Sequence, residues 1–247
     1  MAVRGSIGLL LALGVVVLSA QTPRPAGSPE PSKPLRHLEY SFSVHREGLS
    51  GAEFNGSNDE PLLPGTIGEA GTGGSGTMSV DVLSIAPDGA LVVRISEWVK
   101  LEPRPRQAYT CTVYGNTTVA CPSVPAPSQA EWLLLSYLGR QFVDAAPWDS
   151  QHQWKRAERT EQYDLVENFT LLPGSTDQRA TIRETKIASV HNGDASVQRE
   201  DVTIAYDRAL EVPDIIHDDF TAASDNGSDT GHATFDFQLL RDSFAKS

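Results

Sequence analysis

The sequence predicts a mainly β, α+β fold: a curved antiparallel sheet, in the form of a half-barrel-like meander of about nine strands, packed around one apolar helix near residues 128–143. Three observations predict it. Short runs with apolar residues at alternate positions recur along the chain, as in strands with one buried face. Polar turns rather than helices join these runs, which favours antiparallel connections over βαβ units. A single segment has apolar residues at helical spacing.

The N-terminal twenty residues have the pattern of a secretory signal, with Arg4, an apolar run over 7–18 and a small residue at Ala20. We expect cleavage near Ala20, which makes the mature chain secreted or periplasmic. An uncleaved anchor is the alternative, but the run is shorter than the roughly 20 residues of a membrane-spanning helix, so no transmembrane span is expected in the mature chain. Residues 21–34 contain five prolines and are predicted to form an extended linker.

Residues 35–247 are predicted to form one β-rich globular domain. A polar, glycine-rich stretch at 47–75 is predicted to be a mobile loop. Apart from a cysteine hairpin, the alternating runs lie at 38–45, 78–82, 91–98, 163–171, 180–182, 202–206 and 233–239.

The two cysteines, Cys111 and Cys121, lie symmetrically about Asn116. A three-residue turn at 115–117 pairs Val113 with Val119 and sets the cysteines directly opposite each other on the two strands. An exported protein meets an oxidising compartment, so the sequence predicts a structural disulfide. A redox or metal-binding pair is the alternative, but nine intervening residues fit neither spacing.

The helix is predicted from a capping box, Ser128-Gln-Ala-Glu131, which follows two prolines. Large apolar residues follow the capping box and project around most of the helix circumference. They include Trp132, Leu135, Tyr137, Leu138 and Phe142. A helix that is apolar on most sides must be covered on most sides, which favours a sheet that wraps around it.

This inferred shape resembles the half-barrel of periplasmic lipoprotein carriers, where a curved sheet cups helices and leaves an apolar cleft. The resemblance is one of architecture and implies a binding role. It makes those five apolar residues candidate ligand contacts, with a closed core built from the same residues as the alternative.

The chain carries 32 acidic and 20 basic residues, for a formal charge of −12. An acidic chain argues against a nucleic-acid partner, since phosphate binding depends on clustered Lys and Arg. The charge is uneven, because residues 200–247 hold eleven acidic and three basic residues.

Other motifs that could indicate a cofactor, metal or catalytic site are weak. Gly71–Gly76 contains GxGxxG. A dinucleotide site has a strand before this motif and a helix after it, whereas here a loop precedes the motif and a strand follows. We therefore expect no cofactor. His217 and Asp219 are candidates for a metal or acid/base role. Asp225 and Asp229 have a calcium-like spacing but depart from the EF-hand loop, so no metal site is predicted.

We therefore expect an exported, soluble, non-enzymatic binding or envelope-associated module. A carrier of a small apolar ligand in a half-barrel cleft is one alternative. A hydrolase or metal-binding protein that uses His217 and Asp219 is another. An envelope scaffold joined to a partner protein through the proline-rich linker is a third.

Overall fold

The computed structural model describes part of the chain, in ten segments. These segments are 33–47, 73–100, 102–115, 118–122, 127–138, 153–159, 163–176, 178–190, 196–224 and 230–244. The predicted signal, nearly all of the linker, and residues 48–72 of the predicted mobile loop therefore lie outside the described residues.

The described residues form one antiparallel sheet of eleven strands and one helix, α1 (Gln129–Tyr137). The strands are β1 (Arg36–Glu47), β2 (Gly73–Ile85), β3 (Leu91–Val99), β4 (Tyr109–Val113), β5 (Val119–Ala120), β6 (Gln153–Arg159), β7 (Tyr163–Leu171), β8 (Arg179–Val190), β9 (Ser196–Asp207), β10 (Val212–Ser224) and β11 (Thr230–Asp242). The mainly β meander is confirmed, with two strands, β6 and β10, beyond the predicted nine.

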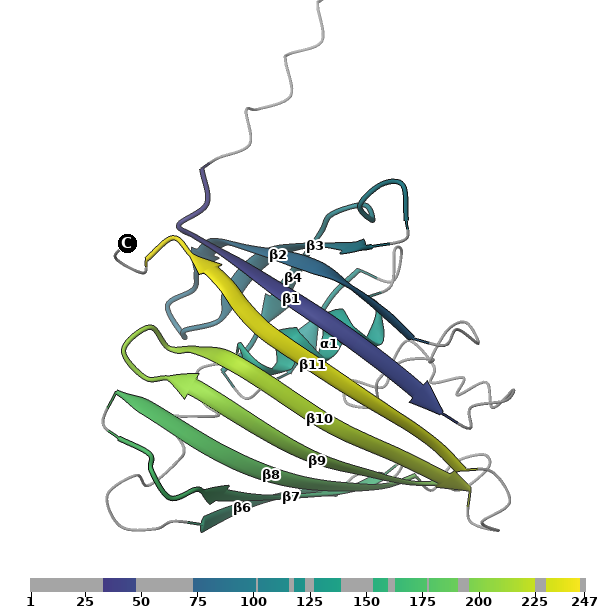
Figure 1. Cartoon of the computed structure of the whole chain (residues 1–247). Helices are drawn as coiled ribbons and strands as arrows, with labels where there is room; N and C mark the ends of the chain where they lie inside the picture. The colour runs from purple at the N-terminus through teal and green to yellow at the C-terminus, as the bar shows by residue number, and fades with distance from the viewer. Residues whose placement is uncertain are drawn as a thin grey trace, which may run out of the picture. The chain divides into compact units, whose positions relative to one another are not determined.

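The order across the sheet is β5-β4-β3-β2-β1-β11-β10-β9-β8-β7-β6. Each strand pairs with its neighbour in sequence, except that β1 and β11 pair at the centre of the sheet, with Phe42 opposite Phe237. In the described residues the outermost strands, β5 and β6, do not pair with each other, so the sheet is not closed. Figure 1 shows the sheet twisting, with α1 on one side of it.

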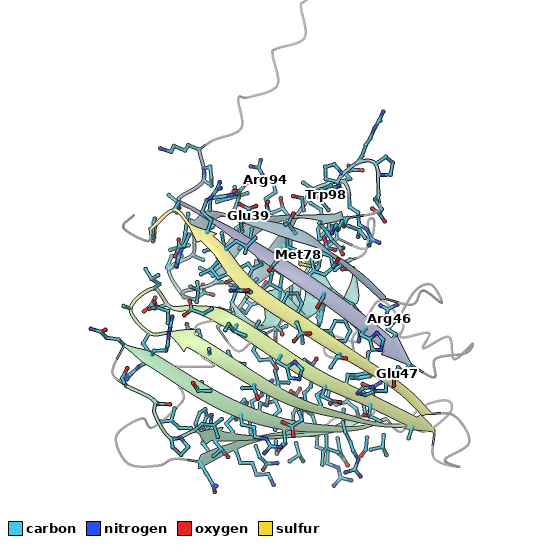
Figure 2. All side chains as sticks on the ribbon, in the orientation of Figure 1. Glu39, Arg46, Glu47, Met78, Arg94 and Trp98 are labelled. Carbon is cyan, nitrogen blue, oxygen red and sulfur yellow. A yellow bond between two sulfur atoms is a disulfide. The ribbon has the colours of Figure 1, made fainter. Side chains whose placement is uncertain are left out.

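One face of the sheet and α1 share the hydrophobic core, and we call this the inner face. Alternate residues of each strand point into it, as the strand period of two requires. On β1 and β2 they include Tyr40 and Met78, both fully buried. Figure 2 shows Met78 beneath the strands, and Arg46 and Glu47 at the end of β1.

Helix α1 begins as predicted. The Ser128 side chain accepts a hydrogen bond from the Glu131 backbone N–H at 3.1 Å, and a Glu131 carboxylate oxygen accepts one from the Ser128 backbone N–H at 2.8 Å. Leu134 and Leu135 are fully buried, and burying each contributes about 1.5–3 kcal/mol. The helix ends at Tyr137, and the rest of its predicted extent, from residue 139 onward, lies outside the described residues. None of the described residues form a helix long and apolar enough to cross a bilayer.

Strand β2 begins at Gly73, inside the stretch predicted as a loop. Gly76 pairs with Phe42 on one side and Val99 on the other. A Cβ atom at Gly76 would lie 1.9 Å from the Trp98 carbonyl oxygen, so only glycine fits there. Gly76 therefore permits the close approach of β2 to its neighbouring strand β3.

The predicted cysteine hairpin is present. Val113 pairs with Val119, the Tyr114 N–H donates to the Thr118 carbonyl, and Cys111 and Cys121 form a disulfide.

Replacing both cysteines by alanine is expected to lower the free energy of unfolding by about 2–3 kcal/mol, since the disulfide closes a short loop in the unfolded chain. Urea unfolding of the variant and of the oxidised protein measures this. An unchanged urea midpoint, or two thiols free to react with an alkylating agent in the unreduced protein, would contradict the prediction.

Candidate functional site

Charged side chains lie on the inner face of β7 to β10, where the strand period places core residues. Glu167, Glu184, Glu200 and Asp218 keep only 6%, 3%, 5% and 2% of their surface exposed. Lys186 lies among them, with 17% of its side-chain surface exposed. We call these five residues the inner charged cluster.

Strand register builds the cluster, because it sets charges of opposite sign next to each other. Arg156 on β6 is opposite Glu167, Glu167 is opposite Lys186, and Lys186 is opposite Glu200. Arg156 Nε lies 2.9 Å from Glu167 Oε2, and Lys186 Nζ lies 3.0 Å from each carboxylate oxygen of Glu200. The resulting row of alternating charge crosses four strands.

Glu184 and Asp218 lie beside this row. The Tyr137 hydroxyl donates a 2.7 Å hydrogen bond to Glu184 Oε2, which joins α1 to the sheet. Asp218 Oδ1 has no hydrogen-bond partner among the described residues, and Asp218 is only 2% exposed. On β9 the inner-facing side chain two residues before Glu200 is Gln198, which is 5% exposed and whose Oε1 also has no partner within the described segments.

Burial and like charge shift the acidities of the cluster. Burial, reinforced by the nearby Glu167 carboxylate, raises the pKa of Glu184 to about 8. Burial and the Glu200 carboxylate raise the pKa of Asp218 well above its usual value. The pKa of Lys186 is raised although burial opposes this, because Glu200 and Glu184 stabilise its charged form. At neutral pH Glu184 therefore mostly holds its proton, while Lys186 is charged.

A second buried group surrounds the first turn of α1. The Tyr109 hydroxyl donates to Glu131 at 2.7 Å, and the pKa of the nearby Glu97 carboxyl is raised by burial and by Glu131. Because Glu131 also completes the capping box, this group has a structural role in fixing the start of α1.

The predicted apolar contacts lie mostly in the core. Leu135, Tyr137 and Leu138 are buried in the main hydrophobic cluster, and Trp132 is partly buried against it. Phe142 lies outside the described residues. Tyr137 reaches the inner charged cluster through Glu184.

The structure places His217 and Asp219 on the outer face of β10, and does not pair them with each other. His217 Nδ1 lies 2.7 Å from Asp236 Oδ1, and His232 Nε2 lies 2.9 Å from Asp219 Oδ1. All four side chains are 38–56% exposed.

Asp225 and Asp229 lie outside the described residues. Within the described segments, no three His, Cys, Asp or Glu side chains are placed to hold a metal ion.

Glu167, Glu184 and Glu200 were not sequence candidates, and Asp218 was considered only beside His217 and Asp219 for a hydrolase role, yet a signal for the buried glutamates existed. Continuing the alternation of Ala180 and Ile182 along β8 places Glu184 and Lys186 on the inner face. Continuing Val202 and Ile204 backward along β9 does the same for Glu200.

Comparison with known proteins adds no family to this description. The chain matches no protein-family model and no curated protein.

Proposed function

We propose that this protein is an exported, non-catalytic binding module, periplasmic or secreted, that holds a small ligand at the inner charged cluster. The observation that carries the proposal is Asp218, a carboxyl buried to 2% exposure, one oxygen of which has no partner in the part of the chain that the structure describes. A buried polar group without a partner costs stability. Natural chains retain such costly groups where function requires them.

The row of alternating charge is not fully buried. Lys186 keeps 17% of its side-chain surface exposed and Arg156 keeps 34%. The Arg156 end of the row of alternating charge is therefore the part of it nearest to solvent.

The hydrogen bonds within the inner charged cluster favour a binding role over a catalytic one. Lys186 donates to both oxygens of Glu200, and Tyr137 donates to Glu184. The remaining oxygen, Asp218 Oδ1, is without a partner among the described residues and can accept a hydrogen bond from a ligand.

Replacing Asp218 by asparagine is expected to raise the free energy of unfolding of the ligand-free protein by about 1–2 kcal/mol at pH 8, because burial raises the pKa of this carboxyl and an amide avoids the cost of burying an ionisable group. Urea unfolding at pH 8 measures the change.

Asp219→Asn is the matched control. Asp219 is the next residue of β10 but is exposed on the outer face, so its replacement should leave the urea midpoint nearly unchanged. A clear loss of stability in Asp218→Asn would show that the carboxyl supports the fold, and the proposal would be wrong.

A further inference from the structure

We propose that Asn168 on β7 is an acceptor for an N-linked glycan, attached where the exported chain meets an oligosaccharyltransferase. Such a modification requires the export that the proposed function includes, and it would lie on the opposite face of the sheet from the inner charged cluster. Three observations carry the assignment: the sequence motif that begins at Asn168, the exposure of this residue, and the cost of asparagine inside a strand.

The chain is rich in the acceptor motif for N-linked glycans, which is asparagine followed two positions later by serine or threonine, with no proline between. Four of the six asparagines begin this motif, namely Asn55, Asn116, Asn168 and Asn226. Serine and threonine together make up 40 of the 247 residues, so chance alone predicts about one such motif. The other three motif asparagines lie outside the described residues, so Asn168 is the one whose surroundings the structure gives.

Strand β7 presents its motif on the outer face of the sheet. Asn168 and Thr170 are two positions apart in an extended strand, so their side chains point to the same face. Asn168 is exposed, while Phe169 between them is buried on the inner face, where it stacks on Trp154. The Asn168 amide makes no side-chain hydrogen bond with the residues that the structure describes. A glycan on Nδ2 would therefore extend into solvent without displacing a core residue.

Asparagine is an unfavourable residue for the middle of a strand. Asn168 is nevertheless paired on both sides, with Lys155 on β6 and Thr185 on β8. The outer positions before and after it on β7 hold the β-branched residues Val166 and Thr170, which strands favour. Strand formation does not favour asparagine at this exposed position and packing does not require it, whereas an acceptor role does.

The donor in this reaction is a lipid-diphosphate-linked oligosaccharide. A bond forms between Asn168 Nδ2 and the anomeric carbon of the first sugar, while the bond from that carbon to a diphosphate oxygen breaks. The lipid diphosphate leaves, the amide gives up one proton, and nothing is oxidised or reduced. Because the middle of a paired strand cannot enter an enzyme's active site, the transfer precedes the pairing of β7 with β6 and β8. The fold then has only to leave the modified side chain exposed.

The experiment expresses the full chain in cultured animal cells and analyses the secreted protein by peptide mass spectrometry, with and without peptide-N-glycosidase. We expect a glycan on Asn168 in more than half of the secreted chains, and Asn168→Gln should lower the mass by one glycan. Thr170→Ala should abolish the modification although Asn168 is still present. Thr170→Ser is the matched control and should keep it, because serine retains the hydroxyl of the motif.

Secreted protein with an unmodified Asn168 would overturn the proposal, even if the other three motifs carried glycans. A glycan on Asn168 that persists in Thr170→Ala would overturn it as well, since the motif would not direct the transfer.

A second form of the chain, with residues 1–20 replaced by the signal peptide of a secreted protein, separates this proposal from the proposed export. If only the second form is secreted and carries the glycan on Asn168, the acceptor site stands and the predicted signal is wrong. If both forms are secreted without that glycan, the export stands and the acceptor site is wrong. If both forms stay in the cell without the glycan, both proposals are wrong.

Discussion

Replacing Lys186 by methionine is expected to lower the free energy of unfolding by about 3–5 kcal/mol, because removing one partner of a buried ion pair leaves the other uncompensated. Lys186 is the cation between Glu167, Glu184 and Glu200, and it contacts both oxygens of Glu200 at 3.0 Å. Urea unfolding at pH 7 measures the loss.

Arg183→Met provides the control, since Arg183 pairs with Asp201 across the same two strands, β8 and β9, but on the outer face. Both members of that pair are exposed, so its loss should change the urea midpoint little. The double variant Lys186→Met with Glu200→Met should recover much of the stability, because an apolar pair replaces the charged one. If Lys186→Met and Arg183→Met had equal effects, the inner charged cluster would not be electrostatically distinct from the surface.

The free energy of unfolding is expected to fall as the pH rises from 5 to 8. The pKa of Glu184 is near 4.5 in the unfolded chain and about 8 in the folded protein, so the folded state binds its proton more tightly. The stabilisation from this proton is complete below pH 4.5 and is lost as the pH rises towards 8. Glu184 alone gives a slope of at most about 1.4 kcal/mol per pH unit.

The raised pKa values of Asp218, Glu167 and Glu97 act in the same direction. Urea unfolding at each pH unit from 5 to 8 gives the slope. Glu184→Gln should flatten it, because an amide does not titrate, while Asp201→Asn on the outer face should keep it. A wild-type stability that does not change over this range would refute the raised pKa of Glu184.

The elements predicted well are those set by neighbouring residues. The capping box of α1 needs only Ser128 and Glu131, and the cysteine hairpin needs only a turn and two short flanking strands. In both, the partners lie within about ten residues of each other, so local spacing is enough to specify them.

The two strands that sequence analysis missed are the ones whose pattern of apolar and polar residues is broken. Strand β6 is an edge strand with Lys155, Arg156 and Arg159 among its seven residues. Strand β10 has Asp218 on its inner face between Ile216 and Phe220. A charged residue at an inner position interrupts the alternation from which a strand is recognised.

The candidate site was missed for the same reason. Glu184 and Glu200 are sixteen positions apart in the chain, and nothing local marks them as neighbours of Asp218 or Tyr137. A buried charge becomes stable only when its partner arrives from another strand or from α1, as with Lys186 and Glu200.

The sequence by itself determined the fold class, the disulfide hairpin and the helix start, since period-two alternation, turn residues and caps act over short distances. Only the tertiary structure decided that β1 pairs with β11, two hundred residues away, and that the inner face carries a charged cluster. Both depend on cross-strand register, which sets which side chains meet and which of them lose contact with water. For Asp218, a carboxyl that looks like a surface residue in the sequence, that register decides that it is buried, with no partner for Oδ1 among the residues that the structure describes.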